Sequence, residues 1–226
     1  MLNPRLNMIF EHINASTVAD VGTDHAYIPI ELMKKGKCTK IIASDISKGP
    51  AKIAEEHIKN NGLDIEVRVG PGITVLEEGE VEQIVIAGMG GKLIVDILKD
   101  SHEIAKSSKL ILQPMNGQYE LRKYLLENGF VITDEDIVTE GIKVYNLIET
   151  NPSGVPLRYE TELDLHLPHF LESHKYYTEL KAKKIREFNK IMNGHKKSAL
   201  NSNAEIIKYY EFLLNEVDCQ AFLFYR

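Results

Sequence analysis

The stretch Val18-Ala-Asp-Val-Gly-Thr-Asp-His-Ala-Tyr27 decides the fold. A short apolar strand, predicted over Thr17–Val21, runs into Gly22, and a helix is expected to follow. Open α/β sheets bind nucleotide-like cofactors at such a strand–turn–helix, because glycine permits close backbone approach and helix-start amides donate hydrogen bonds. Asp20 and Asp24 make the turn acidic, which suits a cofactor that carries positive charge.

The type of cofactor follows from what this turn lacks. A dinucleotide fingerprint reads Gly-x-Gly-x-x-Gly, and here only Gly22 is present, so an NAD or FAD site is disfavoured. S-adenosylmethionine has no pyrophosphate and carries an ammonium and a sulfonium, whose charge two nearby acids complement. The alternative is a turn that only caps a helix in an ordinary α/β protein.

Apolar strands alternate with helical patterns from Thr17 to Glu149, which predicts an α/β fold with a mostly parallel sheet and right-handed crossovers. Glu140-Gly141 separates the last two strands, which predicts an antiparallel edge hairpin. Five β–α units and a hairpin make seven strands, the usual arrangement of Rossmann-like methyltransferases. The expected strands are Thr17–Val21, Lys40–Asp45, Ile65–Val69, Gln83–Ala87, Lys109–Gln113, Phe130–Ile137 and Lys143–Glu149. The expected helices are Ile28–Lys35, Gly49–Asn60, Lys92–Leu98 and Gln118–Asn128, with a short turn near Ile73–Leu76.

A further helix is expected at the N-terminus, where Asn3-Pro4 is a good helix start. Arg5 would lie in its first turn, where a cation is unfavourable for the helix dipole. The misplaced charge hints at a partner, and a solvated arginine is the alternative.

The ends of the later strands carry residues that suit an adenosine. The second strand ends at Asp45, where an acid can accept both ribose hydroxyls. The third is followed by Gly70 and Gly72, which allow an adenine ring to pass closely. The fourth runs into Gly88-Met-Gly-Gly91, an open floor in which Met89 offers a soft apolar surface to a substrate base. A merely flexible loop is the alternative there.

The fifth strand is followed by amide side chains at the same edge of the sheet. Pro114 stops this strand, and Gln113 and Asn116 lie on either side of it. Amides there can read the edge of a flipped base, or simply cap the following helix.

Composition bounds the class of protein. The 226 residues suffice for one α/β domain and an appendage, and the net charge of −6 is not that of a strongly basic nucleic-acid binder. No run of apolar residues is long enough for a membrane helix. The N-terminus lacks the pattern of a signal peptide, and Cys38 and Cys219 are too few for a disulfide framework or a zinc site. We therefore expect a cytoplasmic protein, with no membrane partner, no metal and no covalent nucleophile.

Residues 151–156 are dense in turn residues and predict a linker, with domains over 1–150 and 157–226. Beyond it we expect an antiparallel helical hairpin, His174–Met192 and Ala199–Val217, broken at Asn193-Gly194. The second helix has an apolar seam of Ile207, Tyr210, Leu214 and Val217. This C-terminal region also holds a basic patch, opposed only by Glu187, of Lys181, Lys183, Lys184, Arg186, Lys190, Lys196 and Lys197. A solvated helix face is the alternative to a binding surface.

Four motifs, in their order and spacing, resemble the TrmK family, the bacterial tRNA (adenine-22, N1)-methyltransferases that use S-adenosylmethionine. They are Asp20-Val-Gly-Thr-Asp-His-Ala-Tyr27, Lys48-Gly-Pro50, Ile86-Ala-Gly-Met-Gly-Gly91 and Leu110-Ile-Leu-Gln-Pro114. The resemblance covers roughly 5–149, and the family's helical C-terminal extension is similar in kind. It implies a class I methyltransferase core, a coiled-coil-like tail, and methyl transfer to N1 of an adenine in tRNA.

The resemblance also implies roles for individual residues. Around the target adenine and the methyl group it places Asp24, His25, Tyr27 and Met89. Around the cofactor we expect Asp20, Gly22, Thr23, Asp24, His25, Asp45, Ile46, Gly70, Gly72, Ala87 and Gly88. For the tRNA we expect Arg5, Gln113, Asn116, Lys181, Lys184 and Lys190.

Three positions depart from the family's pattern. Pro71 stands where relatives often have an acid between two glycines, so a contact to the cofactor's adenine amino group is lost there. Asp45 replaces the usual Glu. Met115 stands between Pro114 and Asn116, so Asn116 is offset by one position from the family's Asn.

The alternative functions are a methyltransferase of another base or small molecule, and a non-catalytic nucleotide- or RNA-binding module. A monomer is favoured over an oligomer.

Overall fold

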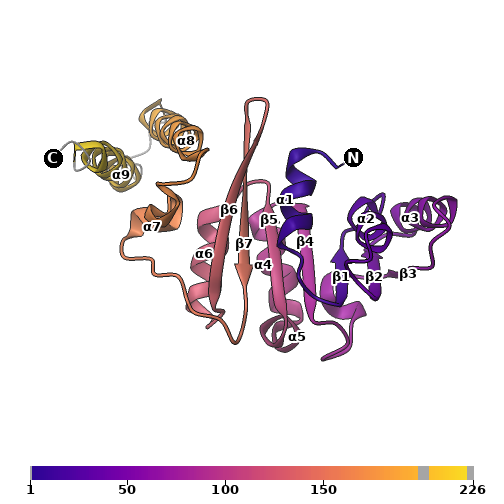
Figure 1. The fold of residues 1–226 in the computed structure, drawn as a ribbon. Coiled ribbons are helices and arrows are strands. Elements are labelled where there is room, and N and C mark those ends of the chain that lie inside the picture. The colour runs from indigo at the N-terminus through magenta and orange to yellow at the C-terminus, as the bar shows by residue number, and fades with distance from the viewer. Residues whose placement is uncertain (1, 198–203, 223–226) are drawn as a thin grey trace. The chain divides into compact units, whose positions relative to one another are not determined.

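The computed structural model describes residues 2–197 and 204–222 (Figure 1). The described chain forms two compact units, Met1–Arg158 and Tyr159–Arg226, which divide beside the predicted linker. No described helix is both long and apolar enough to cross a membrane.

The first unit is built on a seven-stranded sheet, as predicted, in the order β3-β2-β1-β4-β5-β7-β6. The first five strands pair in parallel, and β7 is antiparallel to both of its neighbours, β5 and β6. The order reverses between β1 and β4, which is where open α/β sheets bind ligands. The strands are β1 Thr17–Val21, β2 Lys40–Asp45, β3 Glu66–Val69, β4 Gln83–Met89, β5 Lys109–Pro114, β6 Ile132–Glu140 and β7 Lys143–Thr150.

Helices connect the strands and cover both faces of the sheet. The first begins where Asn3 accepts a hydrogen bond from the Leu6 amide, as its cap pattern predicts. One helix was not expected from the sequence, the short α5. The helices are α1 Pro4–His12, α2 Tyr27–Lys34, α3 Lys48–Asn60, α4 Gly91–Asp100, α5 His102–Ser107 and α6 Gln118–Glu127, with a 3-10 turn, η1, at Gly72–Val75.

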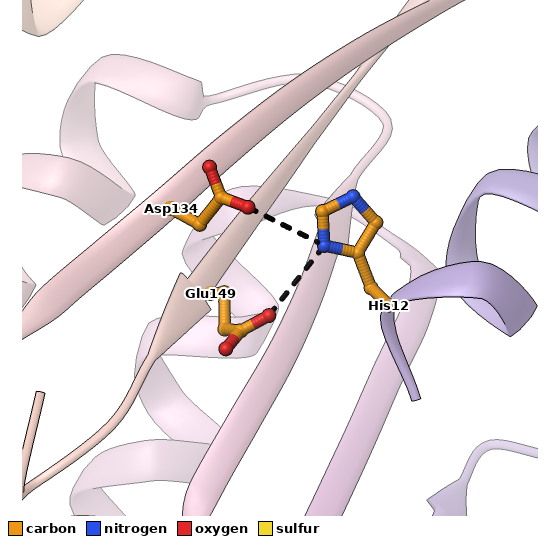
Figure 2. Close-up of side chains that lie close together, drawn as sticks. All are labelled: His12, Asp134 and Glu149. Atoms are coloured by element: carbon orange, nitrogen blue, oxygen red, sulfur yellow. Dashed lines mark hydrogen bonds and ion pairs between the residues drawn. The ribbon is translucent and has the colours of Figure 1, made fainter. Parts of the chain in front are cut away.

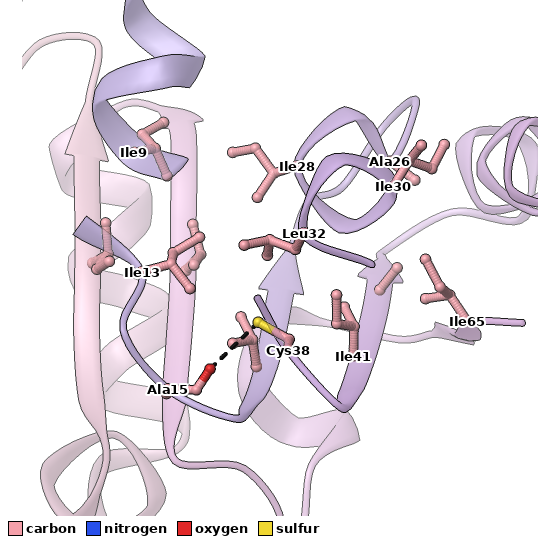
Figure 3. Packing of buried hydrophobic residues seen from close by; sticks show 14 of the residues in the cluster. Ile9, Ile13, Ala15, Ala26, Ile28, Ile30, Leu32, Cys38, Ile41 and Ile65 are labelled. Atoms are coloured by element: carbon pink, nitrogen blue, oxygen red, sulfur yellow. Dashed lines mark hydrogen bonds between the residues drawn. The ribbon is translucent and has the colours of Figure 1, made fainter. Parts of the chain in front are cut away.

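One hydrophobic core lies between α1, α2, α3 and one face of the sheet (Figure 3). Ile9 and Ile13 of the N-terminal segment and Leu32 of α2 are fully buried there. Alternation along the strands assigns the faces: Val85 and Ile111 belong to this cluster, and their chain neighbours do not. Truncating one of these isoleucines to alanine would cost about 2–5 kcal/mol of stability.

The edge of the sheet is held by a buried ion pair. Arg122 of α6 donates to Glu135 of β6 from Nε at 2.7 Å and from Nη2 at 2.6 Å, and neither side chain is exposed. A bidentate pair satisfies both charges, whereas removing one partner would leave a buried charge, a loss of roughly 3–5 kcal/mol. This pair fixes the outermost strand against the helix behind it.

The β6–β7 hairpin is antiparallel and turns at Gly141 and Ile142, as its turn residues predict. It extends past the end of the parallel strands as a long ribbon beside α1 (Figure 1). β6 is the edge strand, and β7 lies between it and β5.

The second unit is helical, with α7 Glu162–His166, a 3-10 turn η2 His169–Leu171, α8 Tyr177–Lys197 and α9 Ala204–Phe222. The predicted break at Asn193-Gly194 is wrong, since α8 runs through both residues. The predicted residues Ala199–Asn203 of the next helix lie outside the described part. Lys196 Nζ donates to Glu211 Oε1 at 2.9 Å, which joins the last turn of α8 to the first half of α9, as in an antiparallel pair.

The buried faces of α8 and α9 differ in part from the predicted seam. In α9 Leu213 and Val217 are fully buried, whereas Ile207, Tyr210 and Leu214 are half-buried. The buried residues of α8 are Leu180, Lys184 and Phe188. The buried faces of α8 and α9 are thus wider than the predicted apolar seam, and that of α8 includes Lys184.

Candidate active site

The turn after β1 is strained. Gly22, Asp24 and Ala26 all have positive φ, at 77°, 47° and 54°. Glycine adopts this conformation freely, whereas alanine there costs about 1–2 kcal/mol. The turn is held by the Gly22 and Thr23 amides, which both donate to the Ser44 carbonyl, at 2.8 and 2.9 Å. Strain retained next to a cavity is typical of functional turns.

A first cavity of about 200 Å³ opens beyond this turn, at the carboxyl ends of β1, β2 and β3. Its walls are mainly apolar, and Ile46 and Leu93 are 72% and 51% exposed there, as walls that a ring would cover. Asp45 lies at its edge, and its Oδ1 accepts from the amide and hydroxyl of Ser47. Of the predicted residues this cavity is lined by Gly22, Asp45, Ile46, Gly70, Gly72 and Met89.

A second cavity of about 330 Å³ lies on the other side of Gly22, and its lining is polar. Asp20 is buried in it and accepts from Thr23 Oγ1 at 2.7 Å. Burial raises the pKa of Asp20 to about 6, because one hydroxyl replaces little of the lost hydration. Of the predicted residues this cavity is lined by Arg5, Asp20, Gly22, Thr23, Asp24, Tyr27, Ala87 and Gly88.

Met89 lies against Gly22 at the boundary of the two cavities. A Cβ added to Gly22 would collide with Met89 Cε, so glycine is required by contact as well as by conformation. Met89 lines the first cavity, the one predicted for the cofactor, and is absent from the lining of the second.

The loop Gly88–Gly91 is pinned in place. The Met115 amide donates to the Met89 carbonyl at 2.8 Å, and the Gly91 amide to the Asn116 carbonyl at 2.9 Å. A Cβ on Gly91 would collide with the Gly117 carbonyl. These contacts hold the loops after β4 and β5 together, which argues against the alternative of a merely flexible loop.

Aromatic rings stand at the mouth of the second cavity. The His25 and Tyr27 ring centroids are 5.4 Å apart, and Tyr27 meets His57 edge-on at 5.5 Å. His57 Nδ1 donates to the His25 carbonyl at 2.7 Å, and Tyr27 is 49% exposed. His25 lines neither cavity, although its ring lies 3.8 Å from the Asp24 carboxylate.

Arg5 reaches the second cavity from α1. Its Nη1 donates to Gln113 Oε1 at 2.9 Å, and its guanidinium lies over the Tyr145 ring at 5.8 Å. Gln113 is fully buried and donates in turn to the Pro114 carbonyl. The prediction that Gln113 reads a base is therefore not supported: it positions Arg5. Asn116 is exposed and lines neither cavity.

The three lysines predicted to bind tRNA differ in exposure. Lys184 is buried, and its ammonium donates to Glu187 at 2.9 Å, so a phosphate contact by this lysine is not supported. Lys181 is half-buried and Lys190 is exposed. Helical spacing is a signal for this, because Lys184 lies four residues from both Leu180 and Phe188 and so shares their buried face.

Four residues of α4 that sequence reasoning missed also line the first cavity. They are Leu93, Asp96, Ile97 and Asp100, and their 3–4–7 spacing places them on one helix face. That spacing is a signal in the sequence. The two carboxylates lie in the same cavity as Pro71, where the family's acid is missing.

The strand order and the two cavities at the carboxyl edge define a Rossmann-like methyltransferase domain. Residues 2–148 match the family described as methyltransferase domain. A tRNA (adenine(22)-N(1))-methyltransferase of Bacillus subtilis is 36% identical over 151 residues, which cover 65% of this chain and 63% of that relative. The chain belongs to the TrmK family.

Solved structures extend the similarity over both units. The crystal structure of the B. subtilis m1A22 tRNA methyltransferase TrmK matches with a TM-score of 0.83 at 28% identity, covering 96% of this chain and 98% of that one. A putative tRNA (m1A22) methyltransferase of Streptococcus pneumoniae, in complex with S-adenosyl-L-methionine, matches with a TM-score of 0.78 at 30% identity, covering 96% and 99%.

Proposed function

We propose that this protein transfers the methyl group of S-adenosylmethionine to N1 of adenine 22 in tRNA. The observation that carries the proposal is the pair of cavities that meet at Gly22, one apolar and one polar. Methyl transfer needs a donor and an acceptor brought together with water excluded, and two joined cavities provide that geometry. The names of the relatives supply the base and its position.

The residues of the first cavity fit the nucleoside of this cofactor. Asp45 would accept hydrogen bonds from the ribose hydroxyls, and Ile46 and Leu93 would cover the faces of the adenine. Asp96 would accept from the adenine amino group, in place of the acid that Pro71 replaces. Asp20, buried in the second cavity with a raised pKa, would gain its missing counter-charge from the ammonium. When bound, S-adenosylmethionine supplies an electrophilic methyl group on its sulfonium.

The reaction requires little acid–base catalysis from the protein's side chains. Adenine N1 carries a lone pair at neutral pH, so no general base is required. Asp24 would accept a hydrogen bond from the amino group of the target adenine and offset the positive charge of the product. Tyr27 and His25 would stack against the extruded base, and Arg5, held by Gln113, would face its sugar-phosphate.

The direct test uses the full chain, labelled S-adenosylmethionine and unmodified bulk tRNA. We expect labelled N1-methyladenosine after digestion, and a reverse-transcription stop beside adenine 22, because N1 methylation blocks base pairing. A tRNA with guanine at position 22 is the matched control. Label in another nucleoside, in metabolites, or nowhere would contradict the proposal.

We propose that the exposed part of the basic patch contacts the tRNA backbone. Arg186 and Lys190 are exposed, and each phosphate contact adds to the salt dependence of binding. The double variant Arg186→Glu/Lys190→Glu should weaken tRNA binding and flatten its salt dependence, whereas Lys208→Glu on α9 should not. If the double variant and Lys208→Glu bound tRNA with equal affinity, the proposal would be contradicted.

A location and an assembly state complete the proposal. A tRNA-modifying enzyme works in the cytoplasm, and we propose that location, with a monomer as the working unit. Light scattering after size exclusion, with and without tRNA, tests the monomer, and a mass near twice 25.6 kDa would contradict it.

A further inference from the structure

A cluster of ionisable side chains lies outside both cavities, where the C-terminal end of α1 meets the β6–β7 hairpin (Figure 2). His12 Nδ1 is 3.5 Å from Glu149 Oε2 and 3.8 Å from Asp134 Oδ2. On the other side of the ring, Nε2 is 3.2 Å from Asp136 Oδ2. None of the four takes part in the proposed reaction.

The distances around Nδ1 are long for direct hydrogen bonds. An N–H donor and a carboxylate oxygen pair best at about 2.7–3.2 Å, and both separations are longer. Two ligand atoms on one tetrahedral cation with bonds of about 2.0–2.1 Å lie roughly 3.3 Å apart. The donor atoms of His12, Asp134 and Glu149 all lie within 4.8 Å of one another. The two carboxylate oxygens are 3.5 and 3.8 Å from Nδ1, so small side-chain rotations would bring the three ligand atoms onto one ion.

The net negative charge of the cluster also favours binding of a cation. Three carboxylates face one imidazole, so the group stays negative even when His12 is protonated. Hydrogen bonds that the His12 ring donates to Asp136 and Glu149 raise the pKa of His12 to about 9, against the effect of burial. Burial raises the pKa of Asp134, and the charge of His12 acts against this rise.

The cluster is open to solvent on one side, and its histidine ring is held by a further carboxylate. The side chains of His12 and Glu149 are 16% and 13% exposed, whereas Asp134 is 58% exposed, so a hydrated ion can enter from that side. Asp136 accepts from Nε2–H, so loss of the Nδ1 proton to an incoming cation would turn a nitrogen lone pair toward the two other carboxylates. Metal-bound histidines are commonly held in this way by an outer carboxylate.

We propose that His12 Nδ1, Asp134 and Glu149 bind one divalent transition-metal cation of the Zn²⁺ class, with Asp136 orienting the ring. One imidazole nitrogen and two carboxylates form a ligand set for Zn²⁺, whereas Mg²⁺ and Ca²⁺ favour all-oxygen sites. A water completes the coordination on the open side. The ion cross-links α1 to β6 and β7, and this role does not depend on the proposed methyl transfer.

The test is metal binding by the full chain after EDTA treatment and desalting. Calorimetry with Zn²⁺ should show a site of one ion per chain, and Co²⁺ should give visible absorption bands of low coordination number. The site should vanish in His12→Gln and in Glu149→Gln, and Asp136→Asn should weaken it about tenfold to a hundredfold. His102→Gln, elsewhere on the first unit, is the matched control and should bind as the unaltered chain does.

Two further readouts separate a metal site from a simple ion-pair cluster. Because Zn²⁺ displaces the Nδ1 proton, its affinity should rise about tenfold per pH unit between pH 6 and 7.5. Excess Mg²⁺ should not compete. The proposal is overturned if the unaltered chain binds neither Zn²⁺ nor Co²⁺, or if His12→Gln and Glu149→Gln retain the site with undiminished affinity.

Discussion

The two cavities that meet at Gly22 recognise their ligands by different physics. The first is lined by exposed apolar side chains, Ile46 just after β2 and Leu93 of α4, with carboxylates at its edges. The second has a buried acid at its base and an arginine, a second acid and a tyrosine around it. Shape and apolar contact therefore dominate on one side, and charge on the other. Substitution, pH and salt should act on them unequally.

The largest effect should come from Gly22, which both cavities share. In Gly22→Ala the new Cβ displaces Met89, which lines the first cavity, and we expect cofactor affinity to fall at least a hundredfold. Isothermal titration measures it. Gly79→Ala is the matched control, since Gly79 also has positive φ but has open space around its Cβ position. If both variants lose affinity equally, the displaced methionine is not the cause.

Asp20→Asn should give the next largest loss. The substitution keeps the shape and removes the charge, and a charge-assisted hydrogen bond contributes about 1.5–3 kcal/mol, or tenfold to a hundredfold in cofactor affinity. The thermal midpoint of the ligand-free chain should not fall, because a desolvated charge has been removed. Asp64→Asn, an exposed acid, is the control. Unchanged affinity in Asp20→Asn would remove the charge argument for the second cavity.

The pH dependence should follow the same carboxylate. The ligand-free pKa of Asp20 is raised to about 6, so the group is ionised above pH 7 and takes up a proton as the pH falls through 6. Only the ionised form attracts an ammonium. The cofactor dissociation constant should therefore be flat above pH 7 and rise below pH 6, and the rise should be missing in Asp20→Asn. If the dissociation constant of Asp20→Asn rose in the same way below pH 6, the pH dependence would belong to another group.

The smallest effect should come from the apolar wall. Leu93→Ala removes contact area from the first cavity, worth about 1 kcal/mol at 25 cal/mol per Å², so affinity should fall about fivefold with no change in pH or salt dependence. Ile53→Ala, a similarly exposed residue of α3 outside both cavities, should bind normally. A new salt dependence in Leu93→Ala would show that the two cavities are not physically distinct.

The sheet could be read from the sequence because its strands are local apolar runs bounded by turns. β1 and β2 match their predicted bounds, and the hairpin lies where Glu140-Gly141 placed it. Two short helices, α5 and α7, were missed, although Thr161 and Asp164 form a capping box that could have shown the second. Asn193-Gly194 was wrong as a helix end, because α8 continues through it to Lys197.

Site residues were predictable from the sequence where they follow one another after a single strand, as in the turn from Asp20 to Tyr27. Contacts between distant segments were not predictable. Gln113 was assigned to a base, yet Arg5, distant in the sequence, occupies its amide oxygen. The ligand atoms of His12, Asp134 and Glu149 come from three elements, so no metal-binding spacing exists in the sequence.

The place of β7 between β5 and β6 has a consequence for the order of folding. The strands that bear both cavities, β1 to β4, pair with one another within residues 17–89 and can form before the hairpin is made. His12 meets its carboxylates only after residue 149 has been synthesised and inserted beside β5. The helix that leaves the ribosome first would therefore dock last, and Arg5 would reach the second cavity only in a finished chain. A truncated or nascent protein would have the cofactor side of its site without the arm that faces the substrate.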